Sequence, residues 1–131
     1  MQWVFIIGDQ SLSLNNFSGI TFSDSERRHQ SEDEFQIYYE KQEYAAFSSC
    51  LEEELKADFE DSEYEELMKK LPFENPNWFM LKYSSVDILK KIISEEEFPD
   101  KVFLYCDGID LGLCEVFDKQ QIRHWFAAFS Y

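Results

Sequence analysis

The pattern of hydrophobic and polar residues predicts a succession of short strands in the first part of the chain. Residues 3–7 are wholly apolar and precede a Gly-Asp pair, which is typical of a buried strand ending in a turn. Residues 11–16 are rich in polar side chains and predict a turn. Residues 19–24 then alternate, with Ile20 and Phe22 on one side, and this period predicts a half-buried strand.

The next stretch has two interpretations. Residues 25–34 are charged throughout and predict a mobile loop, whereas 35–39 alternate between apolar and polar and predict a strand. Residues 44–47 either pair with that strand across a polar turn at 40–43, or begin a single helix over 44–59. Both alternatives fit the pattern.

Two short helices are expected in the acidic stretch that follows. Ser49 with Glu52, and Ser62 with Glu65, match the S-x-x-E capping box, in which two side chains bond otherwise unpaired amides at a helix start. Apolar residues behind each box recur at helical spacing, and Pro72 is expected to end the second helix.

The second half of the chain has clearer periodicity. Residues 78–83 predict a strand, Ser85 caps a helix with one broad apolar face, and 102–105 predict another strand. A strand, a helix and a strand within about 30 residues predict a parallel βαβ unit. A short strand is expected near 111–116, and Asp118 begins a final amphipathic helix.

These elements predict a single α+β domain over residues 1–131, with a mixed β-sheet covered by three to four helices. No internal repeat or Gly/Ser-rich linker divides the chain. Aromatic residues make up 18% of the sequence, which is far above what a disordered acidic tail contains. The chain is therefore expected to fold.

The net charge of −15 is concentrated in one part of the chain. Residues 32–66 hold 14 of the 27 acidic residues and only two bases, Lys41 and Lys56. Such a charge opposes binding to nucleic acid or to an anionic membrane, because both depend on lysine and arginine. It favours a basic protein partner that is steered by electrostatics, and the alternative is an acidity that serves only solubility.

Candidate catalytic chemistry is sparse. The three cysteines cannot form a complete disulfide framework, and their spacing matches no zinc motif, so reduced thiols in a cytoplasmic protein are expected. The N-terminal apolar run is too short for a signal peptide or a membrane span. Scattered glycines form no phosphate-binding loop, and no cofactor or metal site is expected. A small enzyme that uses Cys106 or Cys114 with His124 is one alternative.

Residues 72–85, the helix after them, and 98–108 resemble small acidic bacterial immunity proteins of polymorphic and contact-dependent toxin systems. In such families the acidic inhibitor typically covers the active site of a basic nuclease toxin. The resemblance implies a non-enzymatic cytoplasmic protein that neutralises a cognate toxin. A DNA mimic that blocks a DNA-binding protein is a related alternative.

Acidic side chains interleaved with aromatic ones have the composition of a protein interface with a charged rim. We therefore expect the partner to contact the following residues: Glu52, Glu53, Asp58, Glu60, Asp61, Glu63, Tyr64, Glu65 and Glu66.

Overall fold

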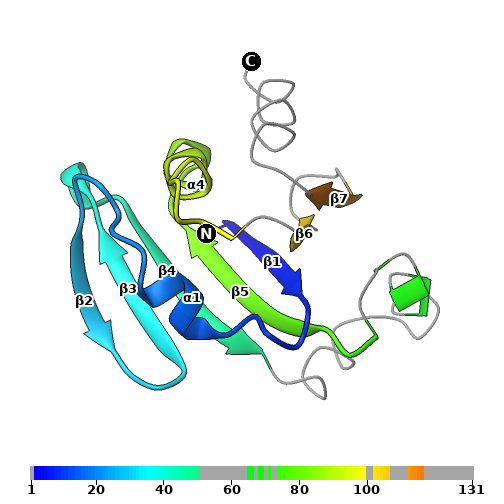
Figure 1. Ribbon diagram of the computed structural model, residues 1–131. Coiled ribbons are helices and arrows are strands. Elements are labelled where there is room, and N and C mark those ends of the chain that lie inside the picture. The colour runs from blue at the N-terminus through cyan, green and yellow to red at the C-terminus, as the bar shows by residue number, and fades with distance from the viewer. Residues whose placement is uncertain are drawn as a thin grey trace.

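A computed structural model describes residues 2–50, 65, 66, 68, 69, 71, 74–99, 102–106 and 112–116. The elements with defined bounds follow in chain order: β1 (Gln2–Gly8), α1 (Leu14–Ser18), β2 (Glu26–Gln30), β3 (Glu34–Tyr38), η1 (Glu40–Gln42), β4 (Tyr44–Cys50), β5 (Asn77–Tyr83), α4 (Val86–Ile93), β6 (Val102–Cys106) and β7 (Gly112–Val116). Figure 1 shows their arrangement.

Within the described residues, seven strands form one sheet in the order β2-β3-β4-β5-β1-β6-β7, and each neighbouring pair is antiparallel. The N-terminal strand β1 lies between β5 and β6, with Ile6 opposite Phe79 on one side and Leu104 on the other. Since β1 runs against both neighbours, β5 and β6 run in the same direction. The unit β5-α4-β6 is thus a βαβ unit split by an inserted strand.

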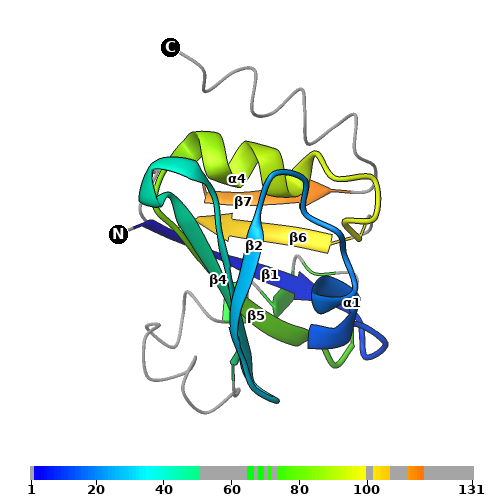
Figure 2. The same cartoon turned by 90° about the vertical axis from the view of Figure 1, so that its left-hand side faces the viewer.

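One face of the sheet carries the main hydrophobic core, which α1 and α4 cover. Phe17 of α1 is fully buried and stacks on Phe47 of β4, with ring centroids 5.1 Å apart. Helix α4 buries Ile88, Leu89, Ile92 and Ile93 in the same cluster. Figure 2 shows the axis of α4 running in nearly the same direction as β6 and β7. Aromatic and β-branched side chains on alternating strand positions complete the core.

The start of α4 follows from its sequence. Ser85 is extended at the N-cap, and its hydroxyl accepts a hydrogen bond from the amide of Ile88 at 3.4 Å. Asp87 in the first turn, with Lys90 and Lys91 in the last turn, complements the helix dipole. The predicted cap and apolar face of this helix are confirmed.

A smaller cluster covers part of the opposite face. Phe5 and Ile7 of β1 pack there with Trp78 of β5, and Met68 and Leu71 from beyond β4 pack against them. Leu71 is 7% exposed. Burial of such a side chain stabilises the fold by about 1.5–3 kcal/mol.

The expected mixed sheet under three to four helices is wrong. Every strand pair in the described residues is antiparallel, and the described α-helices with defined bounds are α1 and α4, both short. The predicted βαβ unit corresponds to β5, α4 and β6. Its two strands run in the same direction, as expected, but they are not neighbours, because β1 lies between them. The strand predicted at 111–116 is present as β7.

Other local predictions also need correction. Residues 19–24 form turns and bends, although Ile20 and Phe22 are buried as the alternation indicated. The charged stretch expected to be a loop contains the edge strand β2. Residues 11–16 include the start of α1, where the amide of Ser13 donates to the side-chain oxygen of Asn16 at 2.7 Å and the amide of Asn16 donates to the carbonyl oxygen of Ser13 at 3.0 Å.

Strand β4 resolves the choice between hairpin and helix for the part that is described. It pairs with β3 from Tyr44 opposite Tyr38 to Ser48 opposite Glu34, so residues 44–50 are a strand. Ser49 lies inside this strand and therefore cannot cap a helix, which makes the first capping-box prediction wrong. The caps at Ser62 and Asp118 and the final helix lie outside the described residues.

Gly8 is required by close packing at the end of β1. A Cβ atom at this position would lie 2.5 Å from Cδ2 and 3.0 Å from Cβ of the buried Leu12. We expect Gly8→Ala to lower the free energy of unfolding by about 1–3 kcal/mol, as overpacking does in other cores. Urea denaturation checks this, and Gly19→Ala is the comparison, because a Cβ atom there would have one close contact, 3.2 Å from the carbonyl oxygen of Asn15, and none to a side chain. Equal stability of Gly8→Ala and the wild type would contradict it.

Candidate partner-binding surface

The described residues include only two of the nine predicted contact residues. Glu65 and Glu66 lie in a helical turn and are exposed. The other predicted contact residues lie outside the described part of the chain: Glu52, Glu53, Asp58, Glu60, Asp61, Glu63 and Tyr64. Met68, which is also helical, packs against the Phe5–Trp78 cluster. The two described carboxylates are therefore held near the sheet by an apolar anchor.

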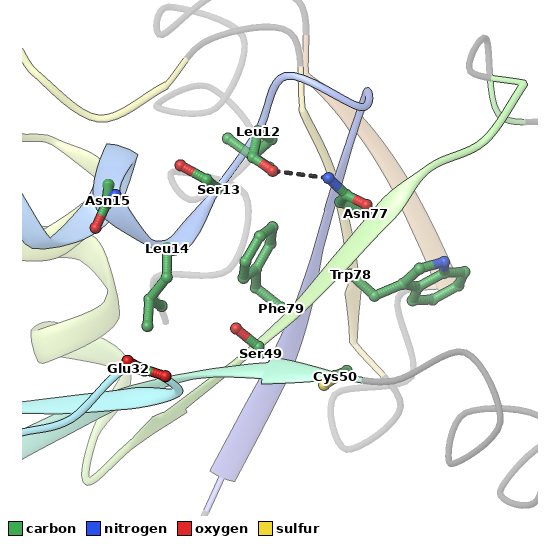
Figure 3. A pocket seen from close by; sticks show the side chains of 10 residues that line it. All are labelled: Leu12, Ser13, Leu14, Asn15, Glu32, Ser49, Cys50, Asn77, Trp78 and Phe79. Carbon is green, nitrogen blue, oxygen red and sulfur yellow. Dashed lines mark hydrogen bonds between the residues drawn. The ribbon is translucent and has the colours of Figure 1, made fainter.

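A cleft opens beside the point where the acidic segment leaves β4. It has a volume of about 360 Å³ and lies between the start of α1, the β2–β3 turn, and the adjoining ends of β4 and β5. Figure 3 shows its described lining: Leu12, Ser13, Leu14, Asn15, Glu32, Ser49, Cys50, Asn77, Trp78 and Phe79. Apolar side chains and polar groups thus meet in one open depression.

Hydrogen bonds hold the segments around the cleft in place. The side-chain amide of Asn77 donates to the carbonyl oxygens of Leu12 at 2.9 Å and Gln10 at 3.2 Å, which ties β5 to the loop before α1. The backbone amide of Ser49 donates to the carbonyl oxygen of Asp33 at 3.0 Å. The acidic β2–β3 turn is therefore fixed against the end of β4.

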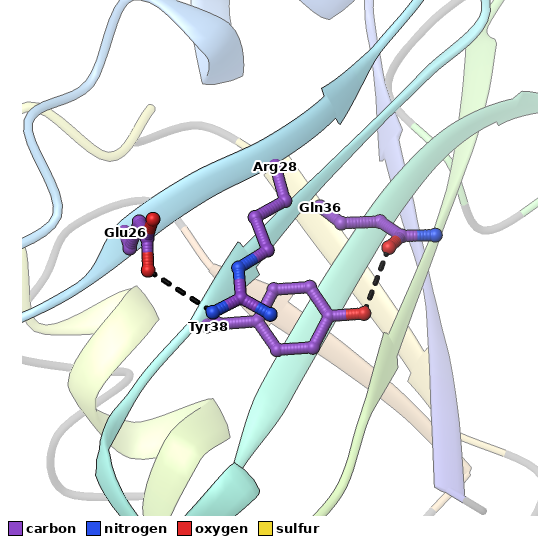
Figure 4. A network of polar contacts seen from close by, with 4 residues as sticks. All are labelled: Glu26, Arg28, Gln36 and Tyr38. Carbon is purple, nitrogen blue, oxygen red and sulfur yellow. Dashed lines mark hydrogen bonds and ion pairs between the residues drawn. The ribbon is translucent and has the colours of Figure 1, made fainter.

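A second feature lies on the strands β2, β3 and β4. The Arg28 guanidinium lies 4.5 Å above the centre of the Tyr38 ring and pairs with Glu26 at 3.1 Å. The Tyr38 hydroxyl donates to Gln36 at 3.0 Å, and its ring stacks on Tyr44 with centroids 5.5 Å apart. Figure 4 shows the polar contacts. Stacked tyrosines with an arginine are frequent at the centres of protein interfaces.

A third feature, a cavity of about 550 Å³, separates the β3–β4 turn from α4. Glu43 links the two elements, because its carboxylate accepts hydrogen bonds from the hydroxyls of Ser84 at 2.6 Å and Ser85 at 2.8 Å. These hydrogen bonds, with a smaller contribution from Lys91, lower the pKa of Glu43 from its usual 4.5. Glu43 is thus a structural carboxylate at the start of α4.

Tyr39 lines the same cavity. Burial, together with the negative charge of Glu95, raises the pKa of Tyr39 to about 12. The ammonium of Lys91 lies 5.5 Å from the centre of its ring. The phenol is therefore neutral at physiological pH, and it is unsuited to act as a base there.

No protein-family model, curated protein sequence or solved structure matches the chain. Only the residues of this chain therefore indicate its function.

The enzyme alternative gains no support from the described residues. The side chains of Cys106 and Cys114, and all of His124, lie outside them. His29 is exposed on the edge strand β2. Across the described ranges, no group of three His, Cys, Asp or Glu side chains is placed to hold a metal ion. Likewise, none of the described helices is long and apolar enough to cross a bilayer.

Sequence reasoning missed the cleft. Its lining comes from four separate segments, and the only sequence signal near it is the acidic turn at Glu32 and Asp33. Both residues were counted in the charge of the acidic stretch, but neither was expected at the contact surface. The pairing of β3, β4 and β5 brings them beside Ser49 and Asn77.

The depressed pKa of Glu43 predicts a pH-dependent contribution to stability. A folded-state pKa below the unfolded value means that this contribution is present above about pH 4.5 and is lost as the pH falls through the folded-state pKa. We expect Glu43→Gln to be less stable than the wild type at neutral pH and equally stable at strongly acidic pH. Urea denaturation as a function of pH measures the difference, with Glu40→Gln as the control in the same turn. A pH-independent difference would contradict the prediction.

Proposed function

We propose that this protein is a non-enzymatic inhibitor that binds and neutralises a basic protein, in the manner of a bacterial immunity protein acting on a cognate toxin. A cationic nuclease is the partner that the charge fits best, since an enzyme that binds nucleic acid presents lysines and arginines around its active site. The acidic segment and the surfaces beside it would cover that site.

The observation that carries this proposal is the anchored position of acidic side chains. Glu65 and Glu66 are exposed in a helical turn, while Met68 and Leu71 nearby in the sequence pack against the sheet. Carboxylates on an ordered surface favour association with a basic partner at lower entropic cost than the same charges on a disordered tail. The net charge of −15 adds long-range attraction of the same sign.

The strands β2, β3 and β4 supply the other part of an interface. The Arg28–Tyr38–Tyr44 stack offers aromatic and guanidinium groups, and these contribute most of the binding energy in many protein complexes. Charges at the rim mainly set the rate of encounter and the choice of partner, and stacked side chains slow dissociation. The acidic residues would thus favour rapid association, and the Arg28–Tyr38–Tyr44 stack would favour slow dissociation.

Co-expression with a candidate toxin tests the proposal. We expect the protein to restore growth of cells that express a basic nuclease toxin encoded next to its gene, and to co-purify with the toxin domain. Capture of a general DNA-binding protein in place of the toxin would favour the DNA-mimic alternative. Growth arrest that persists despite equal expression of both chains, with no complex, would contradict the proposed function.

A further inference from the structure

We propose that the cleft of Figure 3 receives an arginine side chain of the basic partner. This inference rests on the proposed function and adds to it a specific point of contact. The argument depends on the shape of the cleft, the charge of its lining and the rigidity of the segments around it.

The floor of the cleft suits the aliphatic part of a long side chain. Leu12 and Phe79 are buried, at 7% and 4% exposed, and Leu14 is half-buried. Figure 3 shows Leu14 and Phe79 both directed toward the space between α1 and the end of β4. Three methylene groups of an arginine would lie on this apolar surface while the charged end stays near solvent.

The polar groups that line the cleft suit a positively charged group that donates hydrogen bonds. Among the described lining residues Glu32 is the only charged one, and no lysine, arginine or histidine is present. The amide nitrogen of Asn77 is used in bonds to two carbonyls, so its oxygen is the remaining polar atom of that side chain. Guanidinium has five N–H donors and no acceptor, and it therefore matches a lining of carboxylate, hydroxyl and amide oxygens.

The carboxylate is placed on a fixed turn. Besides the bond from Ser49 to Asp33, the backbone amide of Ser31 donates to the carbonyl oxygen of Glu34 at 2.8 Å across the turn that holds Glu32. A turn that is already ordered loses little conformational entropy when a partner binds. Asp33, which is exposed in the same turn, adds negative charge next to Glu32 in the chain.

The cavity beside α4 suits a cationic guest less well. Its described lining holds Lys41 and Lys91 among the carboxylates of Asp24, Glu40, Glu43 and Asp87, so cations already stand beside these acids, and the Glu43 carboxylate is bonded to Ser84 and Ser85. Glu40, which also lines that cavity, lies beyond the opposite end of β3 from Glu32. Both glutamates are exposed, so Glu40 provides a matched control for the loss of one surface charge.

The test uses N-acetyl-L-argininamide as the probe and ¹⁵N-labelled full-length protein in NMR titrations. We expect saturable shifts of the amide signals of Leu14, Ser49 and Asn77. Glu32→Gln is expected to weaken binding about five-fold or more, because it removes a charge-assisted contact. Glu40→Gln is expected to change it less than about two-fold. N-acetyl-norleucinamide, which keeps an aliphatic chain but has no guanidinium, should bind more weakly than the arginine probe.

Shifts centred on another surface, or equal effects of Glu32→Gln and Glu40→Gln, would overturn the inference. The growth assay separates it from the proposed function. Full protection by Glu32→Gln, with unchanged affinity for the toxin, overturns the cleft contact and leaves the function standing. Saturable binding of arginine at the cleft, with no protection by the wild type, supports the cleft chemistry and overturns the inhibitor function.

Discussion

Phe17→Ala is expected to lower the free energy of unfolding by about 3–5 kcal/mol. The Phe17 side chain is fully buried, and its ring centroid lies 5.1 Å from that of Phe47, 5.4 Å from Phe79 and 5.7 Å from Phe98. One ring thus joins α1 to β4, β5 and the segment after α4, and its removal leaves a cavity at their junction.

Urea denaturation followed by tryptophan fluorescence measures this loss. Domains typically have a free energy of unfolding of about 5–15 kcal/mol, so the variant is expected to remain folded over most of this range. Leu14→Ala is the control in the same helix, since Leu14 is only half-buried, and we expect it to cost about 1 kcal/mol. A loss for Phe17→Ala no larger than that for Leu14→Ala would contradict the prediction.

The second large effect is expected in the kinetics of binding. The association rate constant with a toxin that passes the growth assay should fall at least about ten-fold between low and high ionic strength, because salt screens the attraction between opposite charges. The dissociation rate constant should change much less. Stopped-flow mixing over a range of salt concentrations measures both.

Glu65→Gln with Glu66→Gln tests where this attraction arises. The double variant should associate more slowly at low salt and at the wild-type rate at high salt, because glutamine keeps the helical preference and removes only the charge. The control is Glu40→Gln with Glu96→Gln, which removes two exposed charges from other parts of the fold. A salt-independent rate for the wild type would contradict the electrostatic mechanism.

The elements with strong periodicity were predictable, and their arrangement was not. β1, β5 and α4 follow from apolar runs, a cap and an apolar face. The position of β1 between β5 and β6 is a long-range pairing that local patterns do not encode. The mixed sheet was predicted from a strand-helix-strand order that is equally compatible with an inserted antiparallel strand.

Polar segments account for most of the local errors. Every side chain of β2 is exposed, so this edge strand lacks the alternation that marks a half-buried one. The alternation around Ile20 and Phe22 correctly predicted that both side chains are buried. It did not predict the backbone, because two buried side chains in a loop can have the same spacing as in a strand. For the interface, composition predicted acidic contacts, but the cleft depends on segments that only the folded sheet brings together.

The central position of β1 also has a consequence for the newly made chain. This strand is synthesised well before its partners, which begin at Asn77 and Val102. At about 5–20 residues per second, β1 waits on the order of 5–20 seconds for its second neighbour. The β2–β4 meander, whose contacts are local, can form during this interval. A nascent chain released before β6 is made would carry an apolar strand with one unpaired edge, and is expected to aggregate or to be degraded.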